Sequence, residues 1–202
     1  LTGYFMISSL MNIKMQDMLK DLSSKLRSHL MPLDFFYSKN NSKLPKISSI
    51  NDINIPDVER NLLAHHNDMT STLSKFHDSD LYIDVLNSQF NDNYLLRMVV
   101  LKKTKDHTPV EFGAIGINLS SLDSSMVNEI NAGRKPLGKL LEQYSVNYVS
   151  NPRAYFEIEI DDYISKILYS EIGTITYGRC NEITDSQGFT IADIVEVLPK
   201  RN

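Results

Sequence analysis

The chain has 202 residues, 42% hydrophobic and 23% charged, which is typical of one globular domain with its own core or of a domain with a short appendage. A formal net charge of -4 without a basic run argues against an electrostatic nucleic-acid interface, although one or two arginines could still form a local anion pocket. Cys180 is the single cysteine, so neither an intramolecular disulfide nor a cysteine-based metal site can form. No apolar run is long enough for a membrane span, and the first ten residues do not resemble a signal peptide, so we expect a cytoplasmic protein.

Residues 9–30 predict an amphipathic helix that ends at Pro32 and packs on the domain or on a partner subunit; a membrane-surface helix is the alternative. Residues 37–56 are rich in Ser, Asn and Lys and contain two prolines, which indicates a linker. We therefore divide the chain into an N-terminal helix and linker, 1–50, and a main domain, 51–202.

The main domain begins with helical signals and continues with strands. Pro56 is followed by acidic residues, as at a helix start, and Asp68 or Thr70 could cap a second short helix that runs to Phe76. Residues 81–86, 93–102 and 110–118 have the composition of strands, and the polar turn 105–109 predicts a hairpin.

Helices and a second hairpin follow. Ser121 or Asp123 can cap a helix, residues 133–138 interrupt the helical pattern, and Pro136 can begin another helix there. Residues 174–183 and 190–198 flank the turn 185–188 and predict a hairpin. Hairpins with helices between them, and no regular βαβ alternation, indicate an α+β fold with an antiparallel sheet.

Arg97 lies in the middle of an apolar strand. Alternation puts it on the same face as Leu95, Val99 and Leu101. An unpaired buried charge costs several kcal/mol, so Arg97 must reach solvent, pair with a buried carboxylate, or face a cavity that receives an anion.

Glu196 is a second charge among apolar neighbours, on the same strand face as Ile194 and Leu198, while Asp193 lies on the opposite face. Such a carboxylate is either paired or part of a site. Arg97 and Glu196 could therefore form a structural ion pair with each other, or flank a ligand that has a carboxylate and an oxygen to protonate.

Other motifs carry less information. The adjacent His65 and His66 lack metal-ligand spacing, and Cys180 is more typical of a small buried thiol than of a nucleophile. Gly113 and Gly116 lie in a strand and either permit close packing or keep space open beneath a ligand.

Four segments, in order, resemble the chorismate pyruvate-lyase family, in its branch of uncharacterised bacterial, archaeal and plastid members. They are residues 62–70, 95–101 and 135–141, and residues 177–179 with the following hairpin to 199. The resemblance covers residues 57–199. It implies a single α+β domain with a six-stranded antiparallel sheet, covered by helices, around a closed cavity.

The resemblance also implies a cofactor-free, metal-free lyase that eliminates pyruvate from chorismate to give 4-hydroxybenzoate, a precursor for quinone biosynthesis. The expected partner is a small aromatic or cyclohexadienyl carboxylate, without nucleic acid or membrane, and a homodimer is one assembly that the sequence leaves open. Arg97 would hold the ring carboxylate and Glu196 would act as general acid or accept a hydrogen bond from the phenol.

In the same resemblance, Leu137, Gly138 and Met69 would line the cavity, and Arg179 could hold a second carboxylate. The sequence departs from the best-studied branch around Glu196 and at Cys180, which leaves a related diacid or another hydroxybenzoate isomer open as substrate. The alternative function is a non-catalytic sensor of aromatic acids, because ligand-binding domains of some transcription regulators resemble this fold.

Overall fold

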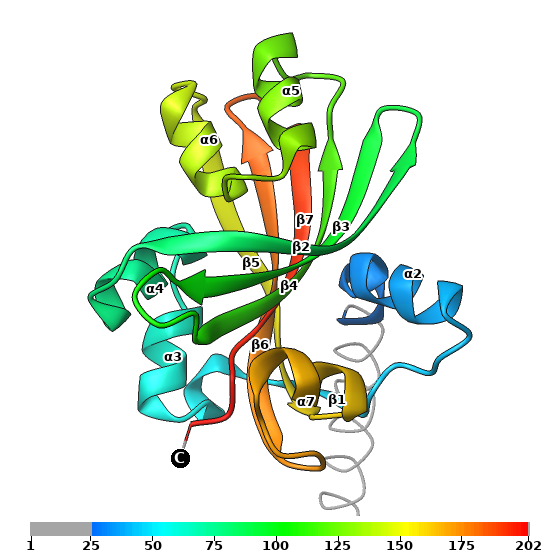
Figure 1. Cartoon of the computed structure of the whole chain (residues 1–202), viewed down its shortest axis with the longest axis vertical. Helices are drawn as coiled ribbons and strands as arrows, with labels where there is room; N and C mark the ends of the chain where they lie inside the picture. Colours follow the sequence, from blue (N-terminus) through cyan, green and yellow to red (C-terminus); the bar gives the residue numbers. More distant parts are fainter. Residues whose placement is uncertain (1–25, 202) are drawn as a thin grey trace, which may run out of the picture.

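One antiparallel sheet organises the molecule. The structure is a computed structural model that describes residues 26–201. Its strands are arranged in the order β1-β5-β6-β7-β4-β3-β2 (Figure 1). The strands are β1 (Ile47–Ile50), β2 (Leu81–Asn91), β3 (Tyr94–Lys103), β4 (Pro109–Asn118), β5 (Tyr148–Glu159), β6 (Ile175–Asp185) and β7 (Thr190–Val197). The predicted α+β class with an antiparallel sheet is confirmed, and the sheet has seven strands where the resemblance implied six.

Helices connect the strands and cover the sheet. They are α2 (Met31–Lys39), the short 3-10 helix η1 (Asp52–Asn54), α3 (Asp57–Leu63), α4 (Met69–His77), α5 (Ser124–Ala132), α6 (Leu137–Gln143) and α7 (Asp162–Leu168). Asp68 caps α4 by accepting a hydrogen bond from the Ser71 N–H (2.8 Å), and Asp123 caps α5 in the same manner. Pro136 directly precedes α6. These three helix starts agree with the sequence prediction.

The N-terminal segment differs from the prediction in two places. Most of the predicted helix 9–30 lies outside the described residues, of which 26–29 are helical. Pro32 lies in the first turn of α2, where its missing N–H costs no helical hydrogen bond, so it opens a second helix and does not end the helical region. β1 lies inside the stretch interpreted as a linker and pairs with β5. The domain division at residue 50 stays a prediction.

The two faces of the sheet have separate cores. One face packs against α2 and α7, and Cys180 is buried in this core, where burial raises the pKa of its thiol. On the other face, α5 and α6 cover one end of the sheet and α3 and α4 cover the other end (Figure 1). Between these two clusters the sheet is not fully covered, and the candidate site lies there.

Alternation along β3 explains why Arg97 faces this second side. Leu96 and Met98 belong to the core under α2 and α7, whereas Leu95 and Leu101 belong to the clusters on the opposite face.

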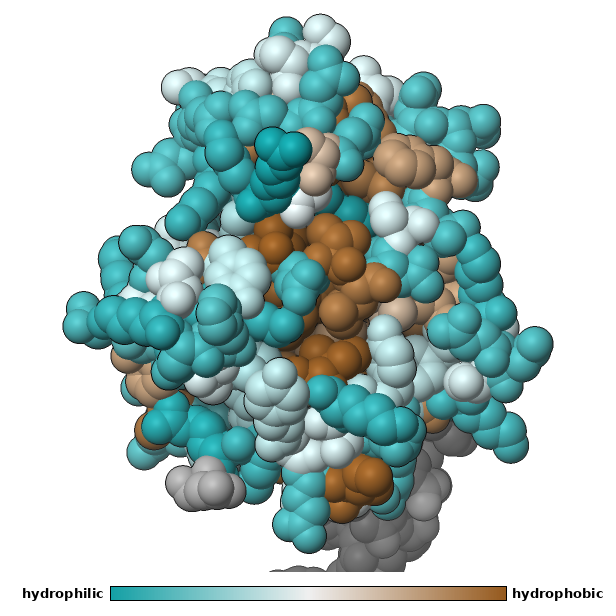
Figure 2. Space-filling view, in the orientation of Figure 1, coloured by the Kyte–Doolittle hydropathy of each residue, from teal (hydrophilic) through white to brown (hydrophobic). Residues whose placement is uncertain are grey.

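None of the described helices is long and apolar enough to cross a bilayer. The visible surface is mostly hydrophilic, with apolar side chains gathered at its centre over the strands (Figure 2).

Candidate functional site

A pocket lies between the apolar core that α5 and α6 form with one end of the sheet and the apolar core that α3 and α4 form with the other end. Its floor comes from β2, β3, β4, β6 and β7, and its opposite wall comes from the residues at the starts of α4 and α6. The cavity volume open to the centre of a water-sized sphere is about 70 Å³. On this measure each enclosed water molecule needs roughly 10–15 Å³. The pocket therefore holds a few water molecules, which a small ligand would displace.

The pairing of β3 with β4 sets the floor of the pocket. Arg97 lies opposite Ile115, Val99 opposite Gly113, and Leu101 opposite Glu111. All six residues line the pocket, because alternate residues of each strand point to the same face. The register therefore places one cation and one carboxylate at different positions along the β3–β4 part of the floor, whose other pocket-lining residues are apolar.

Arg97 is a buried cation without an anionic partner. Its side chain is 2% exposed, its Nη1 donates a hydrogen bond to the carbonyl oxygen of Ile130 in α5 (2.8 Å), and it forms no ion pair with any described residue. Its Nε is buried without a hydrogen-bond partner in that part of the chain. Burial lowers the pKa of Arg97 to about 10, which leaves the guanidinium protonated at neutral pH. Of the three alternatives for Arg97, the structure leaves the one in which it faces a cavity.

Glu196 lines the same pocket but pairs with Arg179. The two residues lie opposite each other on β7 and β6, and Arg179 Nε donates to Glu196 Oε2. The structural ion pair considered between Arg97 and Glu196 is therefore absent. The side chain that the resemblance would make a general acid is the partner of a buried cation.

Arg179 is 0% exposed and does not line the pocket. Its remaining donors reach the carbonyl oxygens of Leu63 (3.0 Å), His65 (2.9 Å) and Asn67 (3.4 Å) in the segment between α3 and α4. This cation therefore fixes the segment that leads into α4, and each of its three nitrogen atoms already has a hydrogen-bond partner outside the pocket.

Met69, Leu137 and Gly138 lie in the wall of the pocket. Met69 is the first residue of α4, and Leu137 and Gly138 begin α6. A Cβ on Gly138 would lie 3.0 Å from Asp68 Oδ1, so glycine allows the starts of the two helices to approach each other. That these residues contact a ligand stays a prediction.

Glu111 is the site residue that sequence reasoning missed. It is 5% exposed, and its Oε2 is buried without a hydrogen-bond partner among the described residues. Burial, and next the nearby charge of Glu196, raise the pKa of Glu111 well above its ordinary value. The signal was present, because Val110 and Phe112 flank this charged residue on a strand, as apolar residues flank Arg97 and Glu196.

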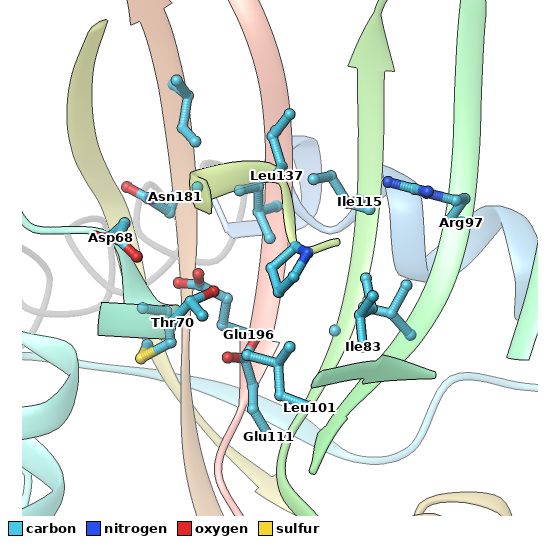
Figure 3. Close-up of a pocket in the computed structure, with 17 residues that line it drawn as sticks. Asp68, Thr70, Ile83, Arg97, Leu101, Glu111, Ile115, Leu137, Asn181 and Glu196 are labelled. Atoms are coloured by element: carbon cyan, nitrogen blue, oxygen red, sulfur yellow. The ribbon is translucent and has the colours of Figure 1, made fainter. Parts of the chain in front are cut away.

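The polar groups occupy different parts of the pocket. In Figure 3, Arg97 lies to one side on its own strand, whereas Glu111 and Glu196 lie close together below the centre and Asp68 and Asn181 lie across from Arg97. The amide of Asn181 is held by Ser150, whose hydroxyl exchanges hydrogen bonds with it. A ligand that fills the pocket would meet a cation at one end and carboxyl groups at the other.

Comparison with known proteins shows the fold. No family model matches the sequence, and no curated protein matches it. PhnF from Mycobacterium smegmatis has a similar structure, with 10% identity over 66% of this chain and 64% of that chain and a TM-score of 0.50. The match thus spans less than two thirds of the PhnF chain.

Two further solved structures are similar. The effector domain of PhnF matches with 10% identity over 66% of this chain and 88% of that domain, with a TM-score of 0.47. A GntR-family transcriptional regulator from Enterococcus faecalis V583 matches with 11% identity over 58% of this chain and 92% of that one, with a TM-score of 0.43.

These comparisons correct the predicted activity. The fold that the chorismate pyruvate-lyase resemblance implied is present, but PhnF, which has a similar structure, is not named as a lyase, and part of it is called an effector domain. Glu196 moreover forms an ion pair with Arg179. The prediction of an enzyme that converts chorismate for quinone biosynthesis is therefore wrong.

Proposed function

We propose that this chain is a non-catalytic sensor domain that binds a small organic acid. One observation carries the proposal: the two buried side-chain polar atoms without a partner in residues 26–201, Arg97 Nε and Glu111 Oε2, belong to residues that line one pocket. Leaving a buried polar group without a hydrogen bond costs about 1–3 kcal/mol. A ligand that supplies both partners would recover that free energy.

The ligand is an anion with an apolar body. Arg97 presents a guanidinium that is already desolvated and whose Nε–H has no partner among the described residues, which favours a carboxylate. The walls beside it are aliphatic, including Val99, Leu101 and Ile115. This combination suits an aromatic or cyclohexadienyl carboxylate, whose ring would cover the aliphatic floor while its charge meets Arg97.

The regulatory part of the proposal comes from the relatives. Part of PhnF is called an effector domain, and we extend that role to this chain. Occupation of the pocket would alter contacts of α5, because Arg97 also holds the Ile130 carbonyl oxygen in the last turn of that helix. A ligand at Arg97 therefore has a direct route to the position of α5.

Isothermal titration calorimetry tests the proposal with benzoate, 4-hydroxybenzoate and the uncharged analogue benzamide. Carboxylates are expected to bind more tightly than benzamide, and Arg97→Met is expected to weaken carboxylate binding by about tenfold to 100-fold, the worth of a hydrogen bond to a charged group. Arg153→Met is the matched control, because Arg153 pairs with Glu182 outside the pocket. Equal affinity of the wild type and Arg97→Met for both carboxylates would contradict the proposal.

Incubation with chorismate tests the absence of catalysis. We expect release of pyruvate at the same rate with and without the protein. Faster release in the presence of the wild-type chain, lost in Arg97→Met, would contradict a purely binding role.

A further inference from the structure

Glu111 has no role in the fold that would explain its burial. Its Oε2 lacks any partner in the described chain, and no described residue forms an ion pair with it. Its neighbours on the pocket floor are Leu101 opposite it on β3 and Gly113 two residues along β4. A Cβ on Gly113 would lie 3.3 Å from Glu111 Oε1, so the missing side chain leaves room for the carboxyl group. The carboxyl group therefore lines the pocket, in room that the absent side chain of Gly113 leaves.

The charges around Glu111 come from every element that borders this end of the pocket. Glu196 on β7 lies nearby, and its charge is matched by Arg179 on β6. Asp68, at the start of α4, is a second carboxylate, and it is already engaged in capping that helix. Arg97, on β3, is four residues along the strand from the position opposite Glu111. No unpaired cation of the described residues is therefore available to hold Glu111 as an anion.

A buried carboxyl group without a cation is most stable in its neutral form. A neutral carboxylic acid has one O–H donor and one carbonyl acceptor. A hydroxyl group matches this pair, because it accepts one hydrogen bond and donates another. A ligand ammonium group would instead require ionised Glu111 and would place two charges where water is excluded, with a desolvation cost for each.

We propose, on the basis of the proposed anion-binding function, that Glu111 in its neutral form binds a hydroxyl group of the ligand at the end opposite the anionic group. The ligand is then a hydroxy acid, with its carboxylate at Arg97 and its hydroxyl at Glu111. Four residues along β3 correspond to about 13 Å between backbone positions. Both residues line the same pocket, so a ring that bears the two groups would lie between them.

The preference for a hydroxyl group is measured directly by calorimetry with benzoate, 3-hydroxybenzoate and 4-hydroxybenzoate. In the wild type, the better hydroxybenzoate is expected to bind at least about tenfold more tightly than benzoate. Glu111→Leu is expected to reduce this ratio to about one, and Glu111→Gln, which retains a donor and an acceptor, to keep most of it. The control pair Glu171→Leu and Glu171→Gln changes an exposed glutamate and should leave the ratio as in the wild type.

The same titrations distinguish a failure of the Glu111 inference from a failure of the proposed anion-binding function. If carboxylates bind but the ratio is the same in Glu111→Leu and the wild type, Glu111 does not read a hydroxyl group, and the anion-binding function stands. If none of the carboxylates binds, the proposed function fails and this inference fails with it.

A fourth probe, 4-(aminomethyl)benzoate, tests for an ammonium group. Tighter binding of this probe than of either hydroxybenzoate, with release of a proton detected by repeating the titration in buffers of different ionisation enthalpy, would overturn the inference in favour of an ionised Glu111. Weaker binding without proton release is the result expected for a neutral carboxyl group.

Discussion

Two buried arginines on one sheet differ in what surrounds them. Arg179 is paired with Glu196 and also donates to three backbone carbonyl oxygens, so its charge is matched and each of its nitrogen atoms has a partner. Arg97 is almost as deeply buried, yet it has one carbonyl partner, no carboxylate, and an Nε without any partner in the described chain. The first arrangement stabilises the fold.

The second arrangement costs stability unless something else completes it. A protein can keep such an incomplete charge when a ligand supplies the missing group. The difference between the two arginines therefore distinguishes a charge that stabilises the fold from a charge that binds a ligand. Substitutions around each arginine should affect stability and ligand binding differently.

Removal of Arg179 is expected to have the largest effect on stability. Arg179→Met leaves Glu196 buried without its cation and releases the segment between α3 and α4. Breaking a buried pair in this manner costs about 3–5 kcal/mol. Urea unfolding gives the free energy directly.

The double variant Arg179→Met with Glu196→Leu is the control for that prediction. It removes both charges and should recover part of the loss. A double variant that is less stable than Arg179→Met alone would show that the buried pair is not the origin of the effect.

Arg97→Met should behave in the opposite manner. It removes an uncompensated buried charge together with one hydrogen bond, so its free energy of unfolding should lie within about 1 kcal/mol of the wild type or above it. Loss of stability comparable to that of Arg179→Met, with carboxylate binding intact, would show that Arg97 stabilises the fold and does not bind the ligand.

Glu111 predicts a dependence of stability on pH. Burial raises the pKa of Glu111 above the ordinary value of 4.5, so the folded chain keeps a proton that the unfolded chain releases as the pH rises past that value. The contribution of Glu111 to stability is fully present below the unfolded pKa and is lost as the pH rises toward the folded pKa.

Glu111→Gln cannot release a proton. Its free energy of unfolding, relative to the wild type, should therefore increase with pH from about pH 4.5 upward and be constant below it. Urea unfolding over a series of pH values measures the difference. A difference that does not change with pH would mean that Glu111 is not held neutral in the folded chain.

Two glycines of β4 separate the two faces of the sheet. A Cβ at Gly113 would enter the pocket floor, 3.2 Å from Val99, so Gly113→Ala should weaken ligand binding with a stability change of about 1 kcal/mol or less. At Gly116, on the opposite face, a Cβ would lie 2.7 Å from the Tyr94 ring. Gly116→Ala should therefore cost about 1–3 kcal/mol and leave binding as in the wild type. Reversal of the two effects would contradict the assigned faces.

Features that depend on local sequence were predictable. The face of β3 that carries Arg97 follows from alternation alone, and the caps at Asp68 and Asp123 follow from one side chain and the next turn of backbone. β1 was not predictable, because four residues of Ile and Ser show too little alternation and their pairing with β5 is formed across the chain.

The partners of the buried charges depend on strand register. Glu196 meets Arg179 because β6 and β7 pair in one particular register, and sequence alone does not give that register. Glu111 could have been found, since it satisfies the criterion that identified Arg97: a charged residue between apolar neighbours on a strand.

The most direct test of the account follows the two arginines by NMR. The Nε–H signals of Arg97 and Arg179 can be assigned by loss of each signal in Arg97→Met and Arg179→Met, and then followed during titration with 4-hydroxybenzoate. The account predicts that the Arg97 Nε–H signal shifts as its missing acceptor arrives, whereas the Arg179 Nε–H signal, already bonded to Glu196, stays in place. Saturable binding with an unchanged Arg97 signal would contradict the claim that Arg97 receives the anion.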